Sequence, residues 1–163
     1  MIAGYDGSSF SDGFLNDVEL VSTKNYNGFC DPMDLDYNAD DQASVATDLG
    51  ILTCGGFNSI NKEMNKCTLQ TEGQIISFPS MKESRYAFGL GIVDDIVFAV
   101  GGYGGERTME KINYKTDSEW TLTNLPFSVK DHCLTTTKQS LVITGGSLQS
   151  GVSKIFLCFV FCE

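Results

Sequence analysis

Glycine pairs that directly follow apolar runs recur along this chain at nearly constant spacing. The pairs begin at Gly55, Gly101 and Gly145, so successive pairs stand 46 and 44 residues apart. The opening segment "MIAGYDG" has the same pattern with Ala3 in place of the first glycine. Each run before an intact pair is rich in residues that favour a buried strand, as in "DIVFAV". A period of this length predicts stacked units, each too small to bury its hydrophobic face alone.

One repeat, residues 84–124, shows the internal pattern of a unit most clearly. Its segments "SRYAFGLGIV", "IVFAV", "TMEKINY" and "EWTLT" are predicted strands, separated by a polar turn, the glycine loop and "KTDS". No segment of the chain shows a convincing helical period. The sequence therefore predicts an all-β protein with four short antiparallel strands per repeat, which is what one blade of a β-propeller requires.

Several positions of these repeats resemble the kelch repeat, a β-propeller blade. An aromatic residue follows the glycine pair at Phe57 and Tyr103, and "FPSMKESRYAFG" places a Met and an Arg before the first strand. Tyr114 and Trp120, six residues apart, match the family's pair in the third and fourth strands. The resemblance implies structural roles for the motif residues, which are Gly55, Gly56, Gly101, Gly102, Tyr114, Trp120, Gly145 and Gly146.

The resemblance covers nearly the whole chain and sets the expected domain organisation. We expect one kelch-type segment over residues 1–163, with complete blades at 40–79 and 84–124 and partial blades at 1–35 and 129–163. Kelch propellers close with more blades than this. The resemblance therefore implies an incomplete propeller, an open arc that is part of a longer protein or a truncated gene product.

The charge of the chain limits its expected partners. With a net charge of −10 and a pI near 4.4, it should repel phosphate backbones and anionic lipid surfaces, so we expect neither nucleic acid nor membrane binding. The longest apolar stretch, "IFLCFVF", is far too short to span a bilayer, and the N-terminus lacks the features of a secretory signal. That absence favours the cytoplasm, whereas secretion stays open if the chain is a fragment.

Two of the six cysteines are candidates for a disulfide. Cys54 ends a predicted strand and Cys67 lies in the next one, about equally far from the turn, so the two would face each other across antiparallel neighbours. A disulfide would suit a secreted protein, and a reduced pair of small apolar side chains would suit a cytosolic one. Both alternatives are open.

Residues that carry enzyme chemistry are sparse, so we expect no catalytic residue, no metal site and no cofactor. His132 is the only histidine, which is too few for the copper site of the oxidases that share kelch-like blades. Its neighbour Cys133 would point to the opposite face of a strand, away from the imidazole. The acidic stretch "DPMDLDYNADD" has Ala39, and Val45 follows it, where an EF-hand needs Gly and Glu. A looser calcium site and a solvated loop are the alternatives there.

Kelch domains generally bind partner proteins, so the resemblance implies a protein-interaction module without catalytic activity. The loops at the propeller faces would form its binding surface. In many kelch domains an arginine before the first strand lines the central mouth, and Arg85 matches that position, with equivalents near Asp41 and Lys130. The candidate contact residues, for a peptide bearing an acidic group, are Arg85, Tyr86, Lys130 and His132. The alternative is that Arg85 only braces a loop.

Two other functions are consistent with the sequence. One is a blade segment of a galactose-oxidase-type enzyme whose further histidines lie in the missing blades. The other is a secreted, disulfide-bonded structural kelch protein, which the state of the cysteine thiols would distinguish.

Overall fold

The computed structural model describes residues 39–60, 62–71 and 74–147, together with the backbone of three short strands outside these ranges. Across these residues the regular secondary structure is entirely β, which confirms the predicted class. Nothing in the described part of the chain is a helix with the length and apolar character of a membrane span.

The first complete blade is an antiparallel meander whose strands follow chain order. Its strands are β3 (Ala43–Thr47), β4 (Gly50–Cys54), β7 (Cys67–Thr71) and β8 (Gln74–Phe78). The residues of β4 and β7 are mostly buried on both faces, as expected for central strands enclosed between neighbouring sheets. Between these two strands the chain forms a small extra hairpin, β5 (Phe57–Asn58) with β6 (Lys62–Glu63).

The second blade repeats this meander. Its strands are β9 (Gly89–Val93), β10 (Ile96–Val100), β11 (Thr108–Asn113) and β12 (Thr121–Asn124). A third sheet has the order β13 (Lys130–Thr136), β14 (Ser140–Ser147) and β15 (Phe159–Phe161). The two four-stranded sheets fall within residues 40–79 and 84–124. The predicted partial blade at 1–35 lies outside the described residues, apart from the backbone of β1 (Asp17–Val18) and β2 (Met33–Asp34), which pair with each other.

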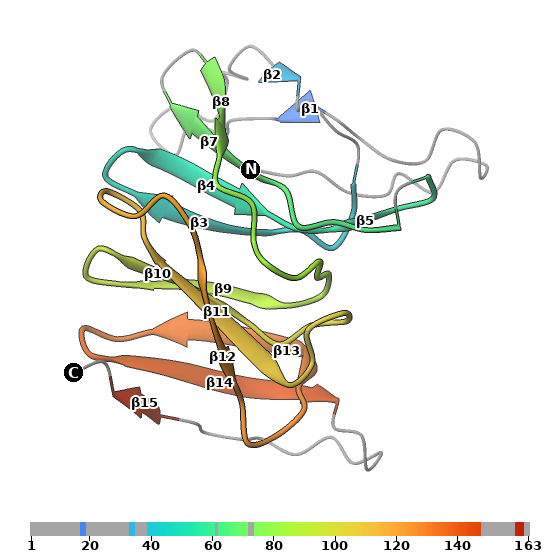
Figure 1. The fold of residues 1–163 in the computed structure, drawn as a ribbon, viewed down its shortest axis with the longest axis vertical. Coiled ribbons are helices and arrows are strands. Elements are labelled where there is room, and N and C mark those ends of the chain that lie inside the picture. Colours follow the sequence, from blue (N-terminus) through green and yellow to red (C-terminus); the bar gives the residue numbers. More distant parts are fainter. Residues whose placement is uncertain are drawn as a thin grey trace, which may run out of the picture.

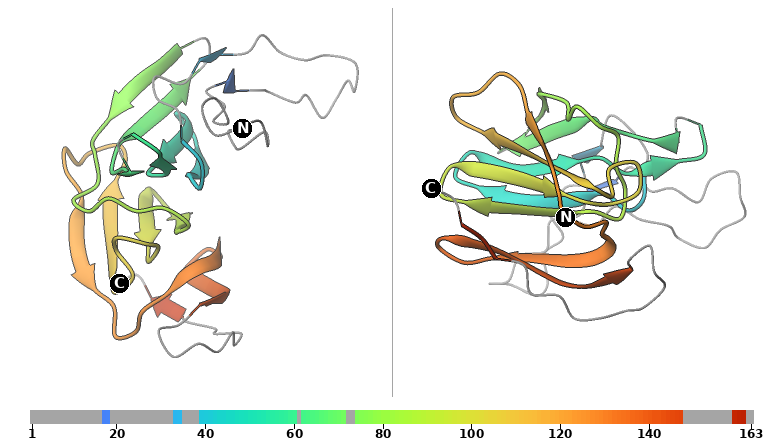
Figure 2. Two further views of the ribbon diagram at one scale, coloured as in Figure 1. Left: turned by 90° about the vertical axis from the view of Figure 1, so that its right-hand side faces the viewer. Right: turned by 60° about the horizontal axis from the view of Figure 1, so that its bottom comes forward.

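The three sheets stack on one another in chain order, as Figure 1 shows from cyan through yellow to orange. Turned by 90°, the same sheets follow an arc (Figure 2). Their first strands, β3, β9 and β13, are neighbours along the inner side of this arc. The described sheets do not close into a ring, which agrees with the expected open arc of antiparallel blades.

A line of backbone hydrogen bonds runs along the inner side of the arc, just before β3 and β9 and at the start of β13. The Ala87 N–H donates to the Asp41 carbonyl at 3.2 Å, and the Asp131 N–H donates to the Ala87 carbonyl at 3.1 Å. Asp41, Ala87 and Asp131 have nearly the same left-handed φ, at 52°, 50° and 53°. They therefore occupy equivalent positions in the three sheets, and we name them the rim residues.

Hydrophobic side chains fill both spaces between neighbouring sheets. Between the first and second blades, Trp120 is 1% exposed and its indole N–H donates to the Pro79 carbonyl at 2.8 Å. Tyr114 is also buried there, and its hydroxyl donates to the Asp48 carboxylate at 2.6 Å. The residues buried between the second blade and the third sheet are Val93, Phe98, Val100, Leu125, Val129, Leu141 and Ile143. Removal of this apolar surface from water is the main stabilising contribution to the stack.

Cys54 of β4 and Cys67 of β7 form a disulfide, which is one of the two alternatives that the sequence left open. The two residues are directly opposite in the strand register, with Cα atoms 4.1 Å apart, and both are fully buried. In the second blade, Val100 lies opposite Met109 at the equivalent position before the glycine pair. The same register is thus held covalently in one blade and by apolar contact in the other.

Glycine pairs join each blade to the chain segment that leads into the next sheet. The Gly56 N–H donates to the Arg85 carbonyl, and the Gly102 N–H donates to the Val129 carbonyl, both at 2.9 Å. Gly101 has a φ of +62°, and a Cβ there would lie 2.3 Å from the Val129 carbonyl oxygen. Glycine is required at this position because no other residue combines a left-handed backbone with so close an approach.

Candidate partner-binding face

The candidate residues lie in connections at one end of the strands, which we name the loop side. These connections link β4 with β7, β8 with β9, β10 with β11, and β12 with β13. The opposite end, the turn side, has the short turns between β3 and β4, β9 and β10, and β13 and β14. All four contact residues predicted from the sequence lie in or next to a loop-side connection.

Arg85 does not line the mouth of the propeller, and its prediction as a contact residue is wrong. Its side chain is fully buried, and its guanidinium donates to the carbonyls of Gly101 and Gly105 at 2.9 and 3.2 Å. It also donates to Glu110 Oε1 at 2.9 Å, in an ion pair that is buried on both sides. Arg85 has the alternative role instead: it braces the loop between β10 and β11, whose carbonyls converge on it.

Glu110 is the buried counter-charge of Arg85 and was not predicted from the sequence. Its carboxylate also accepts the backbone N–H groups of Lys82 and Glu83, at 2.5 and 3.0 Å. A buried charge needs such partners, because its transfer out of water is otherwise very unfavourable. Strand alternation contained the signal, since Glu110 shares a face of β11 with the fully buried Ile112.

The rim residues correct the register in which the blades were compared. The residues that directly precede them are Asp40, Tyr86 and Lys130. Arg85, one step earlier, is therefore equivalent to the buried Ala39 and Val129, and not to Asp41 and Lys130. The position expected to line the mouth is thus buried in all three described sheets.

Three aromatic residues and a lysine form a ladder across the loop side. Phe57 contacts Tyr86 with ring centroids 5.2 Å apart, and Tyr86 stacks on Tyr103 at 4.6 Å with an angle of 7° between the rings. Lys130 Nζ lies 3.8 Å from the centroid of the Tyr103 ring, a cation–π contact. The ladder, Phe57, Tyr86, Tyr103 and Lys130, links all three sheets. It brings two of the predicted contact residues, Tyr86 and Lys130, to one surface.

Carboxylates surround the middle of the ladder. Burial raises the pKa of the Tyr86 phenol, and the nearby Tyr103, Glu63 and Asp41 raise that pKa further. The Tyr103 hydroxyl donates to the Asp131 carboxylate at 3.3 Å. Tyr86 is therefore a neutral phenol at neutral pH, in a neighbourhood of negative charge.

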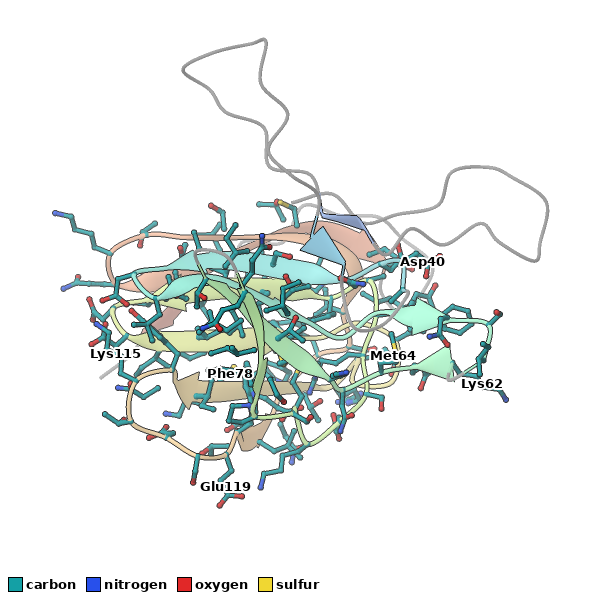
Figure 3. All side chains as sticks on the ribbon, turned by 90° about the horizontal axis from the view of Figure 1, so that it is seen from above. Asp40, Lys62, Met64, Phe78, Lys115 and Glu119 are labelled. Atoms are coloured by element: carbon teal, nitrogen blue, oxygen red, sulfur yellow. A yellow bond between two sulfur atoms is a disulfide. The ribbon has the colours of Figure 1, made fainter. Side chains whose placement is uncertain are left out.

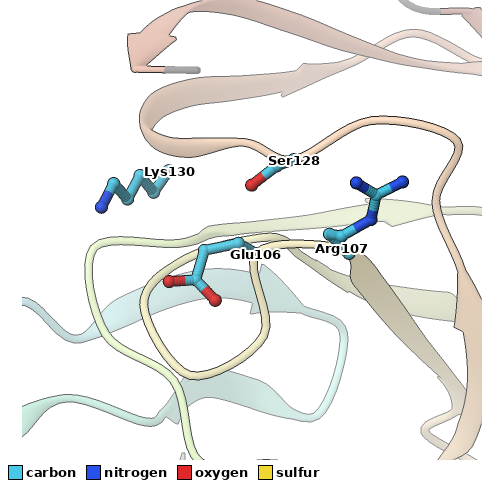
Figure 4. Close-up of a pocket in the computed structure, with 4 residues that line it drawn as sticks. All are labelled: Glu106, Arg107, Ser128 and Lys130. Carbon is cyan, nitrogen blue, oxygen red and sulfur yellow. The ribbon is translucent and has the colours of Figure 1, made fainter. Parts of the chain in front are cut away.

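A cavity of about 220 Å³ opens on the loop side between the second blade and the third sheet. It is lined by Glu106, Arg107, Ser128 and Lys130 (Figure 4). The Leu125 and Val129 N–H groups donate to the carbonyls of Arg107 and Glu106, at 2.7 and 2.8 Å, and so fix the two loops that form its walls. Within the described ranges, neither Glu106 nor Arg107 takes part in an ion pair. This charged cavity presents two cations, one carboxylate and one hydroxyl to a ligand.

His132, the fourth predicted contact residue, is half-buried between sheets, and neither of its ring nitrogens is accessible to a partner. A Cβ on Gly101 would lie 3.1 Å from its Cε1, and one on Gly89 would lie 2.9 Å from its Nε2. Both ring nitrogens are buried without a hydrogen-bond partner among the described residues. Burial lowers the pKa of the imidazole, and the charge of Asp131 opposes that shift. His132 occupies the position that the buried Phe88 has one blade earlier.

The hairpin β5–β6 projects from the loop side, where Figure 3 labels Lys62. Its first residue, Phe57, belongs to the ladder, and Ile60 at its tip is 87% exposed. A single exposed aliphatic residue is ordinary on a protein surface. Its location on a projecting loop beside the ladder makes the hairpin a candidate wall of the binding face.

On the turn side, by contrast, the charged groups pair with one another. Lys115 Nζ, from the turn after β11, lies 2.8 Å from a carboxylate oxygen of Asp48 and 2.8 Å from one of Asp95. These contacts raise the pKa of Lys115, and the bond from Lys115 lowers the pKa of Asp48. Lys115 thus joins the first blade to the second, at the end of the strands opposite to the charged cavity.

Metal-ligating groups are not clustered in the part of the chain that the structure describes, where no three His, Cys, Asp or Glu side chains could hold one ion. The acidic stretch "DPMDLDYNADD", with its looser calcium alternative, lies outside the described residues except for residues 39–41 and the backbone of β2.

Known proteins similar to this chain support the kelch assignment. No family model matches the chain. Kelch repeat and BTB domain-containing protein 2 of Cowpox virus (strain Brighton Red) is 32% identical over 110 residues, which are 64% of this chain and 20% of that protein. The solved structure of YjhT, a kelch β-propeller, has a TM-score of 0.71 and 12% identity, covering 92% of this chain and 50% of that one. The chain is a segment of a kelch-type β-propeller.

The kelch segment has further relatives of the same name. Kelch repeat and BTB domain-containing protein 2 of Horsepox virus is 30% identical over 112 residues, which are 66% of this chain and 20% of that protein. That of Ectromelia virus (strain Moscow) is 28% identical over 109 residues, or 64% of this chain and 20% of that protein. The matched part of the kelch segment thus spans one fifth of the length of these curated relatives.

Proposed function

We propose that the kelch segment is a protein-interaction module without catalytic activity, and that the loop side is its binding face. The observation that carries the proposal is the charged cavity, where two cations, a carboxylate and a hydroxyl lie beside the ladder. The projecting hairpin with the exposed Ile60 adds contact area on the same side. Varied loops on a rigid stack of blades are the arrangement with which kelch domains generally bind partner proteins.

Support for a non-catalytic role comes from how the reactive side chains are used. Acid–base and nucleophilic catalysis need a titratable group whose reacting atom can reach a substrate. Arg85 and Glu110 are buried against each other, and both ring nitrogens of His132 are buried as well. Ser128 in the charged cavity has no described hydrogen bond to a base that would activate its hydroxyl as a nucleophile.

The disulfide favours a second candidate function, a structural kelch protein of an oxidising compartment. Disulfides such as Cys54–Cys67 form and persist mainly in such compartments. A thiol titration of the denatured, unreduced protein from its natural source distinguishes the two. Six free thiols would rule out the structural candidate, whereas a count lower by two or more would support it.

Site-specific photo-crosslinking tests the binding face. A photoreactive amino acid replaces Ile60 or Ser128 on the loop side, or Leu49 or Lys138 on the turn side. We expect both loop-side positions to capture the same protein from an extract of the cells in which the protein naturally occurs, and the turn-side positions not to capture it. Equal capture from the two sides would contradict the proposal.

A further inference from the structure

We propose that the charged cavity binds the carboxylate of a single Asp or Glu side chain of the partner, held between Arg107 and Lys130. This inference rests on the proposed function, since it names the group that the binding face recognises. An acidic partner was expected from the sequence for the contact set Arg85, Tyr86, Lys130 and His132, of which the structure buries the Arg85 side chain and both ring nitrogens of His132. Lys130 belongs to both the predicted set and the charged cavity, and Arg107 takes the place of Arg85 as the other cation.

Arg107 is the first of the two cations. Its side chain is exposed, and none of the carboxylates that the structure describes pairs with it. Its backbone is fixed, because its carbonyl accepts the Leu125 N–H at 2.7 Å. A planar guanidinium presents parallel N–H donors that match both oxygens of a carboxylate. Arg107 is thus an anchored cation without an ion-pair partner in the described part of the protein.

Lys130 is the second cation, and the ladder positions it before any ligand arrives. Its Nζ lies 3.8 Å from the centroid of the Tyr103 ring, which itself stacks on Tyr86 at 4.6 Å. A lysine that is already held over a ring loses less side-chain freedom when an anion binds. The ladder therefore lowers the entropic cost of using Lys130 as a ligand.

Glu106 limits how much negative charge the cavity accepts. Together with Arg107 and Lys130 it leaves the cavity one net positive charge, which one carboxylate neutralises. A phosphoryl group, with a charge of roughly −1.5 to −2 near neutral pH, would place excess negative charge beside Glu106. The Ser128 hydroxyl can donate one further hydrogen bond to the bound carboxylate. This charge balance favours a carboxylate over a phosphate.

The net charge of −10 does not prevent a carboxylate from binding in the cavity, but it limits how many acidic residues the partner segment can have. Charges more than about 8 Å away are largely screened at physiological ionic strength, so the residues of the cavity decide the local interaction. Glu63, Asp41 and Asp131 lie around the ladder next to it. They would repel a run of acidic residues, so the fitting partner segment has one acidic residue among neutral or apolar ones.

An NMR titration of the full 163-residue chain tests the inference. The probe is N-acetylglutamate N-methylamide, and its glutamine analogue is the neutral isostere. We expect saturable amide shifts at Arg107, Ser128 and Lys130 with the glutamate probe and not with the glutamine probe. Arg107→Gln and Lys130→Gln should each weaken glutamate binding by about threefold or more, in the range of solvent-exposed ion pairs.

Two further variants sharpen the test. Lys138→Gln removes an exposed lysine of the β13–β14 turn and is the matched control, with no expected change in affinity. Glu106→Gln should strengthen glutamate binding, and should strengthen binding of N-acetylphosphoserine N-methylamide by a larger factor. Equal shifts with the glutamine probe, or equal weakening by Lys138→Gln and Lys130→Gln, would overturn the inference. Tighter binding of the phosphoserine probe than of glutamate to the unsubstituted chain would also overturn it.

Failure of this inference can be told apart from failure of the proposed function. Capture of a partner through Ile60 without glutamate binding in the cavity would refute the carboxylate site and leave the binding face intact. Glutamate binding without loop-side capture would support the carboxylate site and count against the binding face.

Discussion

At the joint between the first and second blades, Phe88 fills the space beside Gly55, whereas at the joint between the second blade and the third sheet His132 fills the space beside Gly101. A Cβ on Gly55 would lie 2.6 Å from the Phe88 ring, and one on Gly101 would lie 3.1 Å from the His132 ring. The backbone hydrogen bonds of the two joints have the same length, 2.9 Å. The glycine pair thus sets the geometry of a joint, and the ring that fills the joint can change in polarity.

The two joints also differ in their charges. The first contains the buried pair of Arg85 and Glu110, and the second has Val129 where the first has Arg85. Near the second joint, the described cations Arg107 and Lys130 line a cavity. The comparison teaches that the same backbone joint is compatible with a buried ion pair in one place and a charged cavity in the other.

The largest effect is expected when the brace of the first joint is broken. Glu110→Ala leaves the Arg85 guanidinium buried without its counter-charge, and we expect a loss of about 3–5 kcal/mol of unfolding free energy. Urea denaturation followed by the fluorescence of Trp120 measures it. Arg85→Met combined with Glu110→Leu removes both charges and should recover most of the loss. A loss for Glu110→Ala below about 1 kcal/mol would show that the brace is dispensable.

Alanine substitutions in two of the glycine pairs distinguish the cost of a steric clash at a joint from the cost of backbone strain. Gly145 has a φ of +70°, and none of the described residues lies within 4 Å of a Cβ there, so Gly145→Ala should cost only the left-handed strain, about 1–2 kcal/mol. Gly101→Ala has similar strain and also meets the Val129 carbonyl, which should add about 1–3 kcal/mol. Thermal denaturation of both variants gives the difference. Equal losses would mean that the close approach at the joint contributes nothing.

The next effect concerns the pair of strands that leads into each joint. Cys54→Val with Cys67→Met gives the first blade the apolar pair of the second, Val100 and Met109. We expect a loss of about 2–3 kcal/mol, because the disulfide no longer restricts the unfolded chain. Reduction of the unsubstituted protein should cause a similar loss in urea denaturation and should leave the variant unchanged. A reduced protein as stable as the oxidised one would refute the stabilising role.

The smallest effect is expected when the second joint is made like the first. His132→Phe removes two buried nitrogens that have no described partner, and should stabilise the protein by about 1–2 kcal/mol. The low pKa of His132 adds a pH dependence. Well above pH 6.5 the His132 imidazole is neutral in both the folded and the unfolded protein. Below pH 6.5 the imidazole of the unfolded protein binds a proton more readily than that of the folded protein, so the free energy of unfolding decreases as the pH is lowered.

His132→Phe should abolish this fall, which denaturation between pH 5 and pH 8 would measure. If the stability of the variant decreases as steeply on acidification as that of the unsubstituted protein, the decrease comes from carboxylates and not from His132. The exposed Lys138→Gln is the control, with no expected change in either quantity.

Much of the fold could be predicted because its determinants are local in sequence. Left-handed turns that exclude a Cβ demand glycine, so the positions of Gly55 and Gly101 along the chain are enough to mark the ends of equivalent strands. The equal distances of Cys54 and Cys67 from the turn between their strands likewise indicated that the two residues could lie opposite each other, as they do. Both features depend on residues a few positions apart, where periodicity carries the information.

The candidate site was harder to predict because it depends on contacts between distant loops. Arg85 was expected at the mouth from its match to the kelch pattern, and the sequence could not decide for the loop-bracing alternative because the partner Glu110 comes from another strand. His132 was misplaced because its equivalence to Phe88 follows from the rim residues, whose left-handed backbone has no fixed residue type. Arg107 and Ser128 meet Lys130 only through loop conformations that no periodic pattern encodes.

The hydrogen bonds between the rim residues involve only peptide groups, so they place no chemical demand on the side chains that they carry. An aspartate, an alanine and a second aspartate already occupy the three positions with one geometry. A charged rim residue can therefore be replaced by a neutral one in any single blade without a change in the spacing between blades. Any residue that tolerates a left-handed backbone can occupy a rim position. The side chains that a partner would contact there are therefore independent of the backbone hydrogen bonds that hold neighbouring blades together.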